Sequence, residues 1–195
     1  MSAFVINPYR FVSAAPDPEA GLTLTTSFSE AAIIGASDVA RTSDGVFGCD
    51  FTVPASPSGL IYEQGGSGSG AYVGFRSNGA FVLRAGVGSA VAPTASGTDY
   101  AVLYITSGQP SGAGTLVWEY DVSASQIRAW WNGISLGTAS ASVGWSSSQW
   151  AGANPGVFFD DGDTGSGVVT DEEDAKLPAT GISSLRYYQN QLVSL

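Results

Sequence analysis

The stretch Thr115–Thr138, TLVWEYDVSASQIRAWWNGISLGT, decides the fold of this chain. From residue 115 to residue 122 every second side chain is large and apolar, which is the period of a half-buried strand. A tight turn near Ser123–Ala124 then reverses the chain. The hairpin that results predicts the cross-strand pairs Tyr120–Ile127, Trp118–Ala129 and Glu119–Arg128, the last being a pair of opposite charges.

Asn132–Gly133 marks a second turn in the same stretch, because both residues tolerate the positive φ angles of a type I′ hairpin. This turn predicts the pairs Trp131–Ile134 and Ala129–Leu136. The two turns independently divide the side chains between the same two faces. The apolar face, which we expect in the core, carries Trp118, Tyr120, Ile127, Trp131, Ile134 and Leu136, and the polar face carries Glu119, Arg128 and Trp130.

Short strand-like segments lie on both sides of this meander, separated by turns rich in Gly and Pro. We expect a hairpin over 71–85, with Gly79 in the left-handed region and the pairs Phe75–Phe81 and Val73–Leu83. Gln64–Gly70 is expected to be a flexible loop, and not a phosphate loop, because it lacks the Lys-Ser/Thr ending. The other expected strands are 21–29, 45–53, 60–62, 101–105 (at the centre of a sheet), 157–159 and 181–192.

This succession of short strands, with no convincing long helix, predicts an all-β protein with an antiparallel two-sheet jelly-roll sandwich. We expect the sandwich to span residues 21–195 as one domain, because no internal repeat and no linker interrupts it. Residues 1–20 are expected to form an extended N-terminal arm.

The composition excludes several classes of function. The formal net charge is −10 with only 7 Lys and Arg, which argues against nucleic acid as a partner. There is no His, so the commonest general base and zinc ligand is missing. The single Cys49 allows no disulfide within the chain and is expected to be a buried thiol. We see no secretory signal and no apolar stretch of transmembrane length, so we expect synthesis in a cytoplasm and no membrane partner.

The arm is unusually apolar for a terminus that has no helical or strand period. Two interpretations are open: it packs on its own sandwich, or it docks onto another subunit or particle. We adopt docking as the hypothesis, since uncovered side chains of this size would make a monomer aggregate. The docking residues are Phe4, Ile6, Tyr9 and Phe11.

The order of the elements resembles the concanavalin A-like lectin/glucanase superfamily in its laminin-G-like form. The segments that carry the resemblance are Gly45–Val53, Leu60–Gly65, Tyr72–Arg84, Leu116–Leu136, Gly156–Asp160 and Gly181–Leu192. The string INPYRF in the arm looks like the N-terminal segments of tailed-phage structural proteins. These resemblances imply a lectin-like domain on a virion.

Three tryptophans are candidates for carbohydrate binding, because exposed aromatic rings stack on sugar faces. They are Trp130, expected to point away from the core, and Trp145 and Trp150, expected in a loop. Packing against the rest of the chain is the alternative for each of them. Relatives in the superfamily bind calcium through loop carboxylates, so Asp160, Asp161 and Asp163 are either a calcium site or a solvated acidic loop.

We expect no catalysis and no cofactor other than calcium. Glucanases of the superfamily place two Glu around an Asp on one strand, and this chain has no Glu-x-Asp-x-x-Glu. The contiguous acids Asp171–Asp174 are typical of a solvated charge run.

Two functions follow as expectations. The first is a non-enzymatic structural protein of a phage virion surface, a capsid decoration protein or a tail component. It would be made in the host cytoplasm and would assemble as a homo-oligomer on a major capsid or tail protein. The alternative is a carbohydrate-binding or adhesion module that recognises host or environmental glycans.

Overall fold

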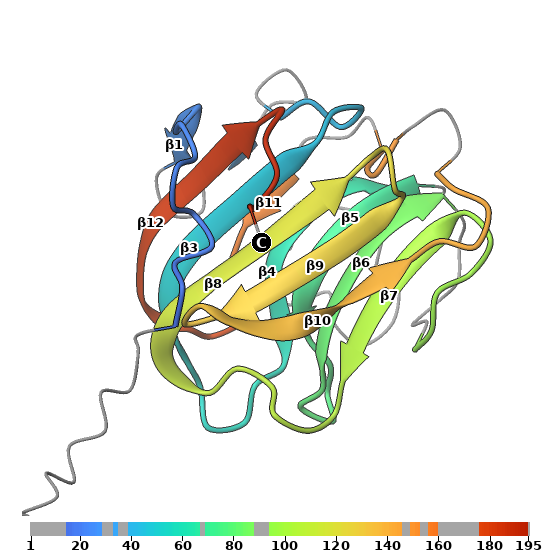
Figure 1. Cartoon of the computed structure of the whole chain (residues 1–195). Coiled ribbons are helices and arrows are strands. Elements are labelled where there is room, and N and C mark those ends of the chain that lie inside the picture. The colour runs from blue at the N-terminus through green and yellow to red at the C-terminus, as the bar shows by residue number, and fades with distance from the viewer. Residues whose placement is uncertain are drawn as a thin grey trace, which may run out of the picture.

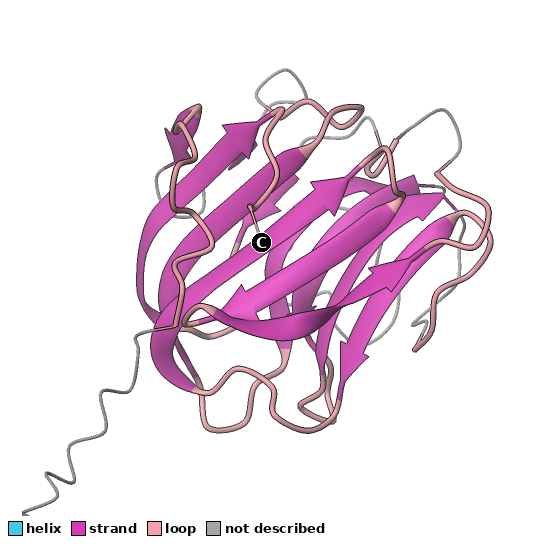
Figure 2. Cartoon of the chain, in the orientation of Figure 1, coloured by secondary structure: helices cyan, strands magenta, loops and turns pink. Residues whose placement is uncertain are grey.

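The computed structural model describes residues 15–28, 33–34, 39–66, 69–87, 94–145, 149–152, 156–159 and 176–194. Within these ranges there is no helix, and the named strands form two six-stranded antiparallel sheets (Figures 1 and 2). Sheet A has the order β1 (Thr26–Phe28), β12 (Thr180–Gln189), β3 (Gly45–Val53), β8 (Gly112–Asp121), β9 (Gln126–Trp131) and β10 (Ile134–Ser140). Sheet B has the order β2 (Ile33–Ile34), β11 (Gly156–Phe158), β4 (Gly59–Gly66), β5 (Ser69–Phe75), β6 (Phe81–Val87) and β7 (Tyr100–Ile105). The predicted all-β jelly-roll sandwich is confirmed.

The meander of β8, β9 and β10 forms as the sequence predicts. Tyr120 pairs with Ile127, and Glu119 pairs with Arg128, with which it forms an ion pair on the outer face of sheet A. Asn132 and Gly133 both have positive φ, as the turn chemistry requires. Local alternation and turn chemistry therefore determine both faces of this part of sheet A.

The apolar face of β10 differs from the prediction. Ala129 pairs with Gly137 rather than with Leu136, because a bulge lies between Ser135 and Gly137. Gly137 takes the positive φ of 137° that this irregularity needs. Ile134 is 66% exposed, and it directly follows the turn at the start of β10, the edge strand of sheet A. Leu136 and Trp131 are only partly buried against the core.

Two further expectations about sheet B were wrong. Residues 64–66 and 69–70 extend β4 and β5, with Gly65 paired to Gly70, so they are not a flexible loop. A Cβ atom on Gly65 would lie 2.5 Å from the carbonyl oxygen of Ser69, so glycine there allows close approach of two strands. β7 was expected at the centre of a sheet, but it is the edge strand of sheet B. Its sequence is continuously apolar because the outward residue Val102 is buried as well. The hairpin that pairs Phe75 with Phe81 is confirmed, with Gly79 at a φ of 79°.

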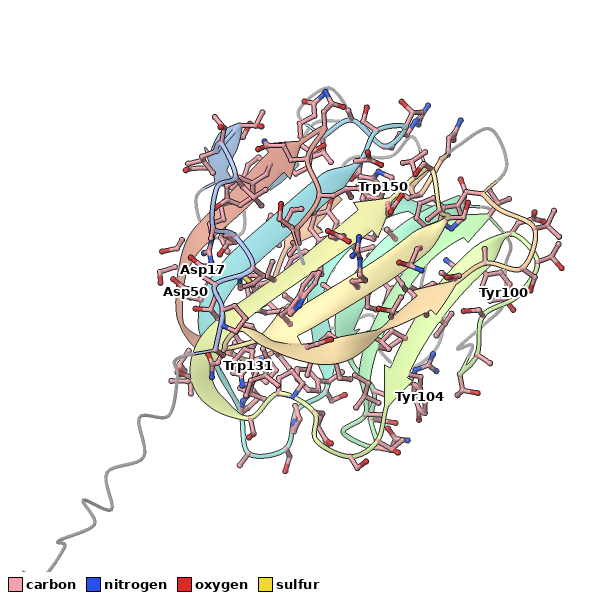
Figure 3. The ribbon with its side chains drawn as sticks, in the orientation of Figure 1. Asp17, Asp50, Tyr100, Tyr104, Trp131 and Trp150 are labelled. Carbon is pink, nitrogen blue, oxygen red and sulfur yellow. The ribbon has the colours of Figure 1, made fainter. Side chains whose placement is uncertain are left out.

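An aromatic cluster centred on Phe47 of β3 fills the space between the sheets. The Phe47 ring stacks on Trp118 of sheet A at 5.2 Å between centroids and contacts Tyr62 of sheet B at 5.0 Å. Trp150, labelled in Figure 3, stacks on Tyr120 at 4.2 Å and donates its indole N–H to the Ser43 carbonyl. These large rings leave few gaps, which fixes the spacing of the two sheets.

We predict that Trp118→Ala lowers the free energy of unfolding by about 3–5 kcal/mol, as truncation of a core aromatic does. Trp118 is fully buried and touches rings from both sheets. The matched control is Ile134→Ala on the exposed edge, for which we expect a change below about 0.5 kcal/mol. Urea denaturation of both variants measures the difference. A larger loss for Ile134→Ala than for Trp118→Ala would contradict the packing described above.

We also predict that stability falls as the pH rises above 9. Burial raises the pKa of the Cys49 thiol from its ordinary 9.0, and burial likewise raises the pKa of the Tyr187 phenol from 10.0 to about 12. The folded state therefore holds protons that the unfolded chain releases. This contribution is complete below pH 9 and is lost as the pH rises further.

The measurement is the denaturation midpoint at pH 8, 9.5 and 10.5, which we expect to decrease along the series. Cys49→Ala should flatten the change between pH 8 and 9.5, where the thiol is the group that titrates in the unfolded chain. A midpoint independent of pH across this series would contradict the prediction.

Candidate functional site

A polar hollow lies on the outer face of sheet A, opposite the aromatic core. Its volume is about 350 Å³. The segment at residues 15–19 crosses the face of the sheet, as Figure 1 shows. Ala15, Asp17, Pro18 and Glu19 of this segment line one side of the hollow. Figure 3 shows Asp17 of this segment beside Asp50 of β3. We call this site the sheet A hollow, and its lining residues are Ala15, Asp17, Pro18, Glu19, Asp50, Thr115, Val117, Asn132, Gly133 and Arg186.

Arg186 of β12 holds the N-terminal wall of the hollow in place. Its guanidinium donates to both carboxylate oxygens of Glu19, at 2.5 and 2.6 Å, and lies 3.5 Å from Asp50. Burial disfavours the charged form of Arg186, but the hydrogen bonds and charge of Glu19, together with Asp50, hold its pKa above the ordinary range. The positive charge in the hollow is therefore already paired.

A second chain of hydrogen bonds orients the remaining polar groups. The hydroxyl of Thr115 donates to Asp50 Oδ1 at 2.8 Å, and the backbone N–H of Thr115 donates to Asn132 Oδ1 at 2.9 Å. The Oδ1 atom of Asn132 is thereby engaged, and its NH₂ group is the donor that Asn132 can offer. Asp50 keeps a 37% exposed side chain, so a ligand can reach its carboxylate. The hollow thus presents fixed hydrogen-bond acceptors and a fixed donor.

Two glycines make this arrangement possible. A Cβ atom on Gly48 would lie 2.7 Å from both Arg186 Nε and Glu19 Oε1, so any larger residue would push the ion pair off the sheet. A Cβ atom on Gly114 would lie 2.4 Å from Asn132 Oδ1. Both positions therefore require the absence of a side chain rather than an unusual backbone angle.

The outer face of sheet B carries a second polar group of residues, which we call the arginine–tyrosine face: Tyr72, Arg76, Arg84, Tyr100 and Tyr104. The Arg84 guanidinium lies 5.3 Å from the centre of the Tyr100 ring, and that of Arg76 lies 5.7 Å from the centre of the Tyr104 ring. Arg84 is only 2% exposed, and desolvation lowers its pKa. The guanidinium groups of this face are therefore buried, unlike the exposed Asp50 carboxylate of the sheet A hollow.

The three tryptophans predicted to bind sugars do not present an exposed ring. Trp130 does point away from the core, but it is 4% exposed and packs with Val46 and Val193. Trp145 is 5% exposed and Trp150 is 0% exposed, and both belong to the main core. The prediction of exposed stacking platforms is therefore corrected, because loop position in the sequence does not report whether a ring turns inward.

The other predicted site residues lie outside the described ranges: the calcium candidates Asp160, Asp161 and Asp163, and the docking residues Phe4, Ile6, Tyr9 and Phe11. Among the residues that the structure describes, no group of three or more His, Cys, Asp or Glu side chains is placed to hold a metal ion. No helix in the same ranges is long and apolar enough to span a membrane.

Sequence reasoning missed most of the sheet A hollow. The Asn132–Gly133 turn was recognised, but as a turn and not as a source of a binding group. Asp50 and Arg186 belong to strands far apart in the sequence, and nothing local marks them as partners.

No family model matches the sequence, and no curated protein does either. Similar solved structures exist. The CBM40 domain of the Ruminococcus gnavus IT-sialidase is 11% identical with a TM-score of 0.54, and the match covers 88% of this chain and 92% of that one. The same domain bound to α2,6 sialyllactose gives 10% identity and a TM-score of 0.52, covering 88% and 93%. The Streptococcus pneumoniae NanB sialidase is 12% identical with a TM-score of 0.55, over 89% of this chain but 26% of the sialidase.

At these identities the likeness shows the fold alone. It confirms the lectin-like jelly roll that the sequence resemblance implied. The match covers nearly the whole CBM40 domain but about a quarter of the sialidase, so the shared unit is a single sandwich.

Proposed function

We propose that this protein is a non-catalytic carbohydrate-binding module that binds a neutral glycan in the sheet A hollow. The observation that carries the proposal is the ordered polar network of Glu19, Arg186, Asp50, Thr115 and Asn132 around an open hollow of about 350 Å³. Similarity to CBM40 domains, two of them bound to sialyllactose, supports the class of ligand.

The chemistry of the hollow suits sugar hydroxyl groups. Asp50 and Asp17 accept hydrogen bonds, the Asn132 amide donates them, and Val117 supplies an apolar floor for C–H groups. The protein side chains are already held by one another, so little side-chain freedom is lost when a ligand binds. A site of this kind recognises a sugar by the placement of donors and acceptors.

The charge of the hollow favours neutral sugars over sialic acid. Three carboxylates, those of Asp17, Glu19 and Asp50, surround one guanidinium that Glu19 already engages through two hydrogen bonds. A ligand carboxylate would meet uncompensated negative charge there. We therefore propose a specificity different from that of the sialyllactose-bound neighbours.

The same pairing argues against glycosidase chemistry. A general acid must reach the glycosidic oxygen, whereas both carboxylate oxygens of Glu19 are engaged by the Arg186 guanidinium. Binding without turnover is the function that this arrangement supports.

We predict that an array of immobilised glycans shows binding to neutral oligosaccharides, and that lactose is bound at least as well as α2,3-sialyllactose. Asp50→Asn keeps an oxygen for Thr115 but removes the negative charge, so we expect at least roughly tenfold weaker binding to the neutral ligand. The matched control is Asp99→Asn, a carboxylate outside the hollow, which should bind like the wild type.

Two results would overturn the proposal. One is the absence of binding to any glycan by the folded wild type. The other is binding that survives Asp50→Asn but is lost in Tyr100→Ala, which would place the site on the arginine–tyrosine face.

As a second function we propose that the module is a homo-oligomeric component of a phage virion surface, attached to a capsid or tail protein through the arm. The supporting observation is the way the chain leaves the sandwich. The Glu19–Arg186 ion pair holds the start of the described chain on sheet A, so residues that precede it are not needed for this clamp. Its localisation would then be the virion, with the sheet A hollow close to the attachment point.

For this function we predict that deletion of residues 1–14 abolishes oligomerisation but changes the melting temperature by less than about 2 °C. The melting temperature should hardly change because the deletion keeps the Glu19–Arg186 ion pair, which fastens residues 15–19 to sheet A. Light scattering coupled to size-exclusion chromatography measures the assembly, and calorimetry measures the melting. An unfolded or aggregated truncation product would show that the arm belongs to the core of its own sandwich.

A further inference from the structure

The C-terminal tail, residues 190–194, crosses the outer face of sheet A after β12 (Figure 1). Asn190 reverses the chain with a φ of 56°, and its N–H donates to the Asp44 carbonyl at 2.8 Å. The side chain of Gln191 bonds to the backbone of Thr23 in both directions, at 2.7 and 2.8 Å. Beyond this point the backbone N–H of Val193 donates to Glu119 Oε2 at 2.7 Å. The last part of the tail is thus held by one hydrogen bond and one small side chain.

Val193 lies in the same apolar cluster as Trp130 and bonds to Glu119, and these two residues together with Arg128 have the composition of a sugar subsite. Trp130 is 4% exposed and lies in one apolar cluster with Val193. On the neighbouring strand, Glu119 is completely buried and is ion-paired with Arg128 of β9. An indole face, a carboxylate and a guanidinium are the groups with which proteins stack on a pyranose and bond its hydroxyls.

A purely structural cover would not need a carboxylate at this position. Desolvation raises the pKa of Glu119, which means that the fold works against its charged form. Buried ion pairs are often no more stabilising than apolar residues of the same volume. The Glu119–Arg128 ion pair beneath the apolar side chain of Val193 is therefore better explained by a binding role that begins when Val193 moves away.

These residues also adjoin the sheet A hollow. Val117 lines the hollow, pairs with Trp130 across β8 and β9, and belongs to the same cluster as Val193. Val117 therefore links the hollow to the cluster that contains the tryptophan.

We propose that residues 191–194 are a displaceable strap over a second sugar subsite formed by Trp130, Glu119 and Arg128. A neutral glycan of two or more units places one sugar in the hollow and stacks the next on Trp130 in place of Val193. The released Glu119 oxygen accepts a hydroxyl hydrogen bond, and Arg128 donates one. This inference rests on the proposed function, and it explains why an outward-facing tryptophan is buried.

The test compares three chains: the wild type, a truncation that ends at Leu192, and a control truncation that ends at Val193. Acrylamide quenching of tryptophan fluorescence should increase only in the chain that ends at Leu192, and Trp130→Phe in that chain should remove the increase. Calorimetry then measures the binding of three pairs, each of a monosaccharide and a disaccharide that contains it. The pairs are galactose and lactose, glucose and cellobiose, and mannose and α1,2-mannobiose. We expect roughly tenfold tighter binding of the disaccharide in the chain that ends at Leu192, with the monosaccharide unchanged.

The outcomes separate this inference from the proposed function. Disaccharide binding that is sensitive to Asp50→Asn, but that does not improve when the strap is removed, overturns the subsite alone. Improved binding that survives Trp130→Leu, which removes the aromatic ring, overturns it as well. No binding of any of these sugars or of arrayed glycans by any chain overturns both proposals. If the chain ending at Leu192 does not fold, Val193→Gly in the full chain removes the valine side chain and keeps the backbone bond, and the same gain is expected.

Discussion

The packing of Phe47 between the two sheets is the constraint on which the rest of the structure depends. Its ring contacts Trp118 on its own sheet and Tyr62 on the other, so it sets both the spacing of the sheets and the direction in which β3 faces. Because side chains alternate along a strand, placing Phe47 inward places Gly48 and Asp50 outward. The sheet A hollow is thus a consequence of the core, since its floor is the back of the strands that the aromatic rings hold.

Both ends of the described chain cover the outer face of sheet A, and each does so through a charged contact. Glu19 binds Arg186 near one side of the face, and Val193 donates to Glu119 near the middle. The hollow lies beside the first of these segments, whose residues Ala15, Asp17, Pro18 and Glu19 line it. Sheet A therefore carries a pre-organised polar surface, whereas the guanidinium groups of the arginine–tyrosine face on sheet B are buried.

The likeness to CBM40 domains and the chemistry of this surface answer different questions. The likeness concerns the path of the backbone, which unrelated sequences share at 10–12% identity. Ligand choice depends on side chains, and here three carboxylates surround a single paired arginine. This protein combines a lectin-like backbone with an acidic polar surface on sheet A.

The sequence alone predicts most of the strands, the two meander turns and the two faces of β8 and β9, because alternation and positive-φ turns act over a few residues. Thus the pair Glu119–Arg128 and the turn at Asn132 were predictable. The bulge at Gly137 was not, and it moved Leu136 out of register. The tertiary fold determines which outward residues are buried, as Trp130 is in its cluster with Val193. It also determines which distant residues meet, as Glu19 meets Arg186 from 167 positions away. Such contacts depend on where the chain returns after folding, and no local pattern encodes that.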